Sequence, residues 1–273
     1  MVNHLLRHAD GLKLAVLVNE FGDLAIDADL IEAEDDNIIS IAGGCVCCSF
    51  GSDLTGALLE MAKLDPRPDH LLIECSGVAI PSAIAGSISL LNDFRTDGIV
   101  ILADAETVRC NARDKYMSDT VLRQITDGNI IILNKADLVE LASLDDTIAW
   151  LKEQKPNVRV IVSEHGVVAR EVVLDSFLGK TKVSLGRHHT EYLEVMTLSL
   201  PNPVDVDDLA QKLADGKNRL IRAKGFATSK SGQKILIQVV GNRWTTTDAP
   251  DHVENGIVCL GFKGELPGID DFL

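Results

Sequence analysis

Four short segments carry residue types that could bind a nucleotide or a metal ion. The first is Asn134-Lys135-Ala136-Asp137, which directly follows an apolar run. An aspartate at such a turn can accept both the ring N–H and the exocyclic amine of guanine, a pair of donors that adenine does not present. Asn134 would brace the loop, and the aliphatic stem of Lys135 would lie over the base. The alternative is an ordinary polar turn capped by Asp137.

Two further segments place a carboxylate at the end of an apolar run. In Glu74-Cys75-Ser76-Gly77, Glu74 could hold Mg²⁺ through water, and Gly77 would let the backbone approach a γ-phosphate. The alternative is a strand end followed by a plain turn. Glu20 follows Val18-Asn19 and opens an acidic stretch with no basic residue before Asp36, in which it is the carboxylate best placed to act.

The fourth segment contains three of the six cysteines, at positions 45, 47 and 48, within Gly43-Gly44-Cys45-Val46-Cys47-Cys48. Three thiolates this close can converge on one soft ion, while the glycines give the backbone freedom to wrap around it. The spacing is poor for a disulfide framework, so metal binding or redox chemistry in a reducing compartment is favoured. A redox thiol pair and three unrelated small buried residues are the alternatives.

The elements that position these segments alternate between apolar runs and amphipathic stretches. We predict buried strands at 14–18, 38–41, 71–73, 99–102, 130–133 and 158–162, and helices at 54–64, 82–91, 114–125 and 144–155. The runs lack the alternation of a half-exposed sheet, so both of their faces are expected to be covered. Alternating strands and helices predict a doubly wound, mostly parallel α/β sheet.

The pattern changes near residue 179. We predict a first domain at 1–178, a polar linker at 179–190 and a smaller α+β domain at 191–273. In the last of these, strands are expected at 192–200, 220–227, 235–240 and 257–262, with a helix at 205–213. A domain of this size can bury a core of its own.

Composition and charge limit the class of protein. Of the 273 residues, 46% are hydrophobic and 25% are charged, which rules out a disordered or fibrous chain. The net charge is −15, and such a surface repels nucleic-acid phosphates, so nucleic acid is not expected as a partner. No apolar run approaches the ~18 residues that span a bilayer, and the N-terminus lacks the apolar core of a secretory signal. We therefore expect a cytoplasmic protein with no membrane segment.

The order of VNEFGD, GGCVCC, ECSG and NKAD resembles the CobW-type family of metal-chaperone GTPases, relatives of the urease and hydrogenase accessory GTPases. The stretches at 222–226, 241–244 and 257–262 look like the second domain of that family. The resemblance implies a P-loop-NTPase-like first domain and a set of site residues. These are Cys45, Cys47 and Cys48 for the metal, Glu74 and Gly77 for Mg²⁺ and the γ-phosphate, and Asn134, Lys135 and Asp137 for guanine.

Two further positions are matched by the same resemblance. Glu20 corresponds to the glutamate of the switch loop, which would couple the metal to the nucleotide. His188 and His189 lie where many members carry a His-rich segment.

One departure from the family concerns the phosphates. The family opens with a strand and a P-loop, GxxxxGK[ST], and this motif occurs nowhere in the 273 residues. Residues 1–6 resemble the middle of the helix that follows the P-loop. We therefore interpret the chain as truncated, lacking the first strand of its sheet, and expect upstream codons to encode both missing parts. Without the P-loop, weak nucleotide binding and poor GTP turnover are expected.

The resemblance implies a metallochaperone that passes Zn²⁺, or Co²⁺, to a client metalloprotein while it hydrolyses GTP with Mg²⁺. The chain is compatible with a homo-oligomer. A metal-buffering pseudo-GTPase without hydrolysis is the first alternative. A thiol redox protein that uses Cys47 and Cys48 is the second.

Overall fold

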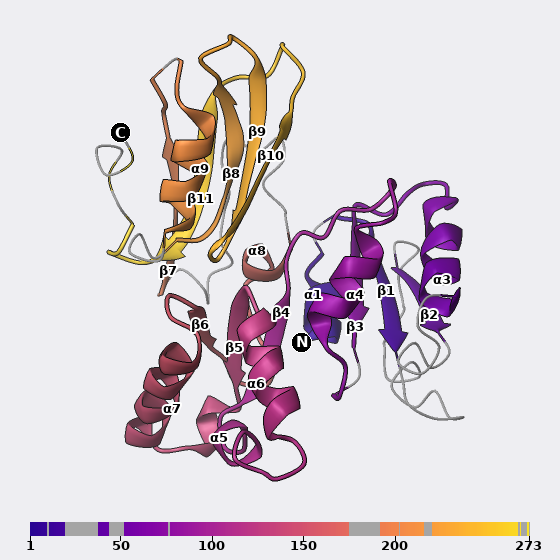
Figure 1. Cartoon of the computed structure of the whole chain (residues 1–273), viewed down its shortest axis with the longest axis vertical. Helices are drawn as coiled ribbons and strands as arrows, with labels where there is room; N and C mark the ends of the chain where they lie inside the picture. The colour runs from indigo at the N-terminus through magenta and orange to yellow at the C-terminus, as the bar shows by residue number, and fades with distance from the viewer. Residues whose placement is uncertain are drawn as a thin grey trace. The chain divides into compact units, whose positions relative to one another are not determined.

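The computed structural model describes residues 1–9, 11–19, 38–43, 52–75, 77–174, 192–201, 203–215, 220–266, 268 and 272. The chain divides into two compact units (Figure 1). The first contains residues 1–99 and 111–127, and the second contains residues 100–110 and 128–273. Within the described residues, no helix combines the length and the apolar character needed to cross a bilayer.

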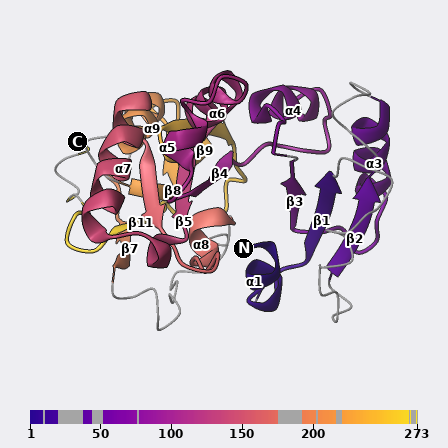
Figure 2. The same cartoon turned by 90° about the horizontal axis from the view of Figure 1, so that it is seen from below.

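The first unit contains a three-stranded parallel sheet in the order β2-β1-β3. Its strands are β1 (Leu14–Asn19), β2 (Ile38–Gly43) and β3 (His70–Glu74), and its helices are α1 (Val2–Arg7), α3 (Ser52–Ala62), α4 (Pro81–Ile88) and α6 (Ser118–Asp127). β1 lies in the centre, and Ala15 and Leu17 pack with Leu58 and Met61 of α3. The apolar run therefore becomes the buried middle strand, and Figure 2 shows α3 running beside β2.

The second unit begins with another three-stranded parallel sheet, in the order β4-β5-β6. Its elements are β4 (Val100–Asp104), α5 (Val108–Asn111), β5 (Ile130–Asn134), η1 (Ala136–Leu138), α7 (Leu141–Gln154), β6 (Arg159–Val162) and α8 (Arg170–Val173). All four side chains from Ile130 to Leu133 are fully buried. The expectation of two covered faces holds for β5, whereas at the edge strand β4 the side chain of Leu102 is half exposed.

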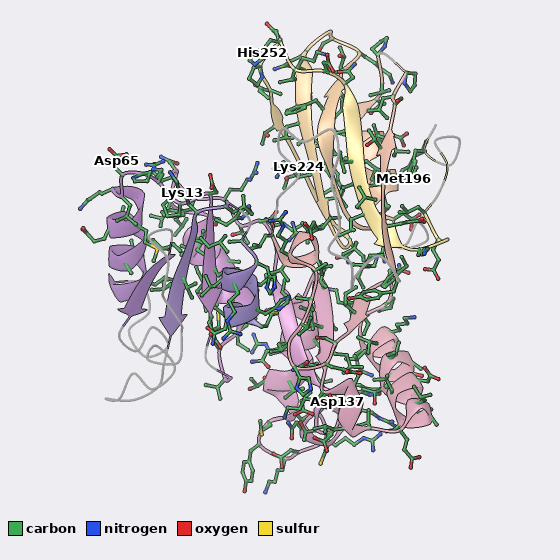
Figure 3. All side chains as sticks on the ribbon, turned by 180° about the vertical axis from the view of Figure 1, so that it is seen from behind. Lys13, Asp65, Asp137, Met196, Lys224 and His252 are labelled. Atoms are coloured by element: carbon green, nitrogen blue, oxygen red, sulfur yellow. The ribbon has the colours of Figure 1, made fainter. Side chains whose placement is uncertain are left out.

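A five-stranded antiparallel sheet completes the second unit, in the order β10-β9-β8-β11-β7. It consists of β7 (Leu193–Leu198), β8 (Leu220–Thr228), β9 (Lys234–Val240), β10 (Arg243–Asp248) and β11 (Gly256–Phe262), with α9 (Val206–Ala214). Leu209 and Leu213 of α9 pack on one face of this sheet. They belong to a buried apolar cluster against which Met196 of β7 also packs. Because side chains alternate along a strand, Lys224 points to the opposite face (Figure 3).

Two buried arginines join this antiparallel sheet to the parallel strands of the same unit. Arg222 on β8 is 3% exposed and donates from Nε to the Val172 carbonyl (2.8 Å) and from Nη2 to the Val173 carbonyl (2.7 Å), at the end of α8. Arg159 at the start of β6 donates from Nε to the Leu220 carbonyl at the start of β8. The N-terminal ends of β6 and β8 are therefore held by charged hydrogen bonds.

A glycine permits a third contact between the two sheets. Gly241 lies in the turn between β9 and β10 with φ +58°, and a Cβ there would collide with the carbonyl oxygen of Asn129, just before β5. Only glycine supplies both this backbone conformation and this close approach.

The predicted fold class is confirmed: the strands predicted as parallel are parallel, and a separate antiparallel C-terminal domain follows them. The parallel strands are divided between two sheets, a division that the sequence did not indicate. Strand β10 was missed, because its Arg-Trp-Thr-Thr-Thr-Asp sequence lacks an apolar run. The predicted domain boundaries at 178, 179 and 190 lie outside the described residues.

Candidate functional site

The loop that follows β5 carries the predicted guanine-binding residues. β5 ends at Asn134, and Lys135 turns the chain with a left-handed backbone, φ 62°. The 3-10 helix η1 then carries Asp137, whose side chain is 28% exposed (Figure 3). A fully buried strand followed by an abrupt turn thus presents a partly exposed carboxylate at the carboxyl end of the sheet, where ligands bind in open α/β folds.

An ion pair links this loop to the neighbouring strand. Nζ of Lys135 lies 2.6 Å from Oδ2 of Asp104, the last residue of β4. Burial opposes ionisation of Asp104, but the hydrogen bonds from Lys135 and from the amides of Glu106 and Thr107 outweigh it and lower the pKa of Asp104. The ammonium of Lys135 is thereby held over the end of β4.

A second loop, which sequence reasoning missed, is fastened to the first. It follows β6 and runs from Ser163 to Val167. The amide of Gly166 donates to Oδ1 of Asn134 (2.9 Å), the amide of Ala136 donates to the Ser163 carbonyl (3.2 Å), and Oγ of Ser163 donates to the Val167 carbonyl (2.9 Å). The signal available in the sequence was the polar Ser163-Glu164-His165-Gly166 run directly after an apolar strand.

A histidine of this second loop faces the aspartate. His165 has φ 52°, is 81% exposed in its side chain, and places Nε2 at 3.9 Å from Oδ2 of Asp137. The carboxylate of Asp137 therefore has one loosely placed neighbour and keeps acceptor capacity for two N–H groups of a ligand.

The predicted γ-phosphate residues lie in the first unit. Glu74 is the exposed last residue of β3, and Gly77 is exposed in the segment that leads to α4. A Cβ built on Gly77 would meet no heavy atom of the described residues beyond its chain neighbours within 4 Å, so on their side the space beside its backbone is open to a ligand. Nε2 of Gln124, on α6, donates to the carbonyls of Gly77 and Ala79, at 2.9 Å each. Sequence reasoning missed Gln124, for which the sequence gives no local signal.

Two of the three cysteines within the described part of the chain have thiols with raised pKa values. Burial and the neighbouring Glu74 carboxylate raise the pKa of Cys75 to about 11, and burial raises the pKa of Cys259 to about 12. Both are protonated thiols at neutral pH, whereas metals bind the thiolate. Cys110 is exposed. The described residues contain no group of three or more His, Cys, Asp or Glu that could hold a metal ion.

The remaining predicted site residues, Glu20, Cys45, Cys47 and Cys48, together with His188 and His189, lie outside the described residues. Among the others, the structure brings Asn134, Lys135 and Asp137 together with the Ser163–Val167 loop in the second unit. Glu74 and Gly77 belong to the first unit, where Gln124 contacts the Gly77 backbone.

Family comparisons agree with this arrangement of motifs. Residues 1–162 match the family described as CobW/HypB/UreG, nucleotide-binding domain. The chain belongs to this family. Residues 193–263, which contain β7 to β11, match the family described as cobalamin synthesis protein cobW C-terminal domain. The resemblance found in the sequence is therefore confirmed over both domains of the CobW-type chain.

Several named proteins are similar to the CobW-type chain along most of its length. It is 26% identical to a zinc chaperone CobW of Sinorhizobium sp, over 89% of this chain and 81% of that protein. It is 26% identical to the zinc chaperone YjiA of Escherichia coli, over 83% of this chain and 76% of that protein. A zinc-regulated GTPase metalloprotein activator of Dictyostelium discoideum is 27% identical, over 86% of this chain and 61% of that protein.

A solved structure is also similar. The crystal structure of the Zn(II)-bound YjiA GTPase from E. coli aligns with 98% of this chain and 92% of that chain, at 20% identity and a TM-score of 0.46.

Proposed function

We propose that this chain is a GTP-dependent zinc metallochaperone that delivers the ion to a client metalloprotein in the cytoplasm. The observation that carries the proposal is the loop of Asn134, Lys135 and Asp137, which is fixed to its neighbours at three points and presents a carboxylate. The names of its relatives, zinc chaperones and a GTPase metalloprotein activator, support the same function.

Guanine recognition would follow from the chemistry of this loop. Asp137 accepts the ring N–H and the exocyclic amine of guanine, and the stem of Lys135, held at its ammonium end by Asp104, covers the base. Adenine offers no such pair of donors, so its binding would leave the carboxylate without partners. Discrimination of this kind is strong, because a polar group that loses its partner on binding costs free energy.

The phosphate end would use the loop after β3. Glu74 is exposed and is a fitting water-mediated ligand for Mg²⁺, and the open space beside Gly77 suits a phosphate oxygen. When bound, Mg²⁺ neutralises charge on the phosphates during attack by water. The chain's own part would be to orient: Glu74 would hold Mg²⁺ through water, and the Gly77 backbone would approach the phosphate. The reaction converts GTP and water to GDP and phosphate.

The zinc ion is the cargo, and we assign it to Cys45, Cys47 and Cys48. Three thiolates suit Zn²⁺ and also accept Co²⁺. Glu20 would join this cysteine loop to the nucleotide, so that hydrolysis orders and releases the metal site. The raised pKa values of Cys75 and Cys259 disfavour their thiolate forms, so we do not assign these residues to the metal site.

The proposal is tested by titrating the purified chain with GDP and with ADP in the presence of Mg²⁺, and by measuring its zinc content after anaerobic purification. We expect GDP to bind at least about tenfold more tightly than ADP, and about one zinc ion per chain. Equal affinities would contradict the guanine site. A chain that retains zinc and binds neither nucleotide would instead be a metal-buffering protein without GTPase activity.

A further inference from the structure

The segment between β3 and α4, residues 77–80, is held by one face of α6. Gln124 contributes both N–H groups of its amide, which donate to the carbonyls of Gly77 and Ala79 at 2.9 Å each. A glutamine amide nitrogen has two donors, so this geometry uses its full capacity. The two carbonyls are two residues apart, and a single side chain therefore fixes the course of the backbone between them.

Three residues further along α6, a second side chain holds the end of the same segment. Oδ2 of Asp127 accepts from the amide of Ser82 at 3.0 Å. Helix α4 begins with Pro81, which has no amide hydrogen, and its N-cap Ile80 has no side-chain acceptor. The amide of Ser82, the first amide of α4 that can donate, is therefore capped by a side chain of α6. Gln124 and Asp127 are three residues apart and so lie on the same face of α6.

Side-chain burial contributes little to the position of the first half of this segment, since only Ala79 and Ile80 are partly buried. Gly77 has no side chain, and Val78 is 58% exposed. A glycine beside an exposed valine has a large conformational freedom to lose on folding. The hydrogen bonds from Gln124 are therefore the contacts that select one conformation of the Gly77 backbone.

We propose that Gln124 is a positioning residue for phosphate sensing: it fixes the backbone at Gly77 so that a γ-phosphate is recognised there. The role rests on the proposed function of the Gly77 loop. Both hydrogen bonds from Gln124 go to carbonyls of the segment, and among the described residues no hydrogen bond uses the Gly77 amide, which therefore stays available to the ligand. The residue thus acts through the backbone and touches no substrate atom.

Two substitutions separate this role from a general effect on folding. In Gln124→Glu a carboxylate replaces the amide, so both donors become acceptors that the carbonyls repel. In Gln124→Met the length of the side chain is kept without donors or charge. Gln211→Glu at an exposed position of α9 is the matched control, because it makes the same chemical change in a helix of the second unit.

The experiment measures the NMR order parameters of the backbone amides of residues 77–80 and the affinities for GDP and GTPγS with Mg²⁺, at nucleotide concentrations up to the millimolar range. In both Gln124 variants we expect these order parameters to fall from about 0.85, typical of a rigid backbone, towards about 0.6 or below, because the two hydrogen bonds that hold the segment are lost. GDP affinity should stay within about twofold, while the ratio of GTPγS to GDP affinity should move towards one. The Gln211 control should match the wild type in all three measurements.

The outcomes distinguish the inference from the function on which it rests. If the wild type binds both nucleotides and the Gln124 variants keep its order parameters at residues 77–80 or its GTPγS to GDP ratio, the positioning role is wrong and the proposed function stands. If GDP affinity falls as much as GTPγS affinity in the variants, Gln124 only stabilises the fold in general, and the inference is overturned. If the wild type binds neither nucleotide, the proposed function fails and the role fails with it.

Discussion

The ammonium of Lys135 lies 2.6 Å from the carboxylate of Asp104, so the turn after β5 is tied to the end of its neighbour β4. Lys135 has a left-handed backbone, which directs its side chain across the sheet end instead of along the strand. The ion pair should hold the stem of Lys135 in place over a bound base, and it should make the stability of the fold depend on pH.

The first prediction concerns Asp104→Asn. The pKa of Asp104 is lowered in the folded chain, so its contribution to stability is present above the unfolded-state pKa and is lost as pH falls through the folded pKa. The variant should therefore melt at slightly lower temperature than the wild type at pH 7, and the difference should vanish in acid. The effect is small because both side chains are partly exposed.

The same variant should weaken GDP binding about three- to tenfold, because the stem of Lys135 loses its anchor. Asp146→Asn is the control, since the exposed Asp146 of α7 pairs loosely with Arg109 at 3.9 Å. Melting curves between pH 3 and 7 and a GDP titration check both parts. An unchanged GDP affinity would show that the ion pair does not orient the lysine for the base.

The second prediction is a change of base specificity in Asp137→Asn. An amide can donate to the second carbonyl of xanthine, whereas the carboxylate of the wild type accepts the exocyclic amine of guanine. The variant should lose GDP affinity by at least about tenfold and gain affinity for xanthosine diphosphate. Competition between the two diphosphates, measured by titration calorimetry, checks the exchange of preference.

A useful companion variant is His165→Asn, which removes the ring that lies 3.9 Å from Asp137 but keeps the carboxylate. It should retain the preference for guanine over xanthine. If Asp137→Asn and His165→Asn show the same nucleotide preferences as the wild type, the base is not recognised at this loop.

The third prediction concerns the metal. Replacing Cys47 and Cys48 with serine should lower zinc affinity by orders of magnitude, and affinity in the wild type should fall with decreasing pH, because protons compete for the thiolates. Cys110→Ser and Cys259→Ser should bind zinc as the wild type does, since Cys110 is a single exposed thiol and Cys259 is a buried thiol with a raised pKa. Competition with a chelator measures the affinities. Loss of zinc from the Cys110 or Cys259 variant alone would contradict the assignment.

Sequence reasoning located the strands that contain an apolar run, within about one residue for β1, β5, β8, β9 and β11. β1 and β5 read as uninterrupted apolar runs, and their central residues are almost completely buried. β10 is not stabilised by a buried apolar run. It pairs with β9 through a two-residue turn at Gly241 and Asn242, and Trp244 packs against the core cluster that includes α9. The Gly-Asn turn between Val240 and Arg243 was the hairpin signal that could have located it.

The sequence could indicate candidate residues that directly follow a strand. It could not indicate the contacts that join residues far apart in the chain. The turn at Asn134 to Asp137 could be found because its residue types and its place after β5 both point to base recognition. The bonds from Gln124 to Gly77 and from Gly166 to Asn134 join positions 47 and 32 residues apart. Such pairings depend on the tertiary fold, and a single sequence does not encode them in any local pattern.

The last prediction concerns Arg222, which holds the C-terminal sheet to α8. Its guanidinium is 3% exposed and satisfies the carbonyls of Val172 and Val173. Arg222→Met would keep much of the packing volume and leave both carbonyls without these charged donors, so we expect a loss of about 2–4 kcal/mol in the free energy of unfolding. Arg243→Met, at a partly exposed position of β10, is the matched control and should change it by less than about 1 kcal/mol.

Urea unfolding of the wild type and both variants gives these free energies, and hydrogen exchange at β8 and α8 locates the change. Because only Val168 and Ala169 separate the Ser163–Val167 loop from α8, exchange should also rise in that loop in Arg222→Met, and GDP should bind more weakly even though no residue of the base site is altered. Equal stability of the Arg222 and Arg243 variants would mean that the two carbonyls find water in place of the arginine. If Arg222→Met is less stable but binds GDP as the wild type does, Arg222 holds the sheets together and does not influence the loop of Asn134 to Asp137.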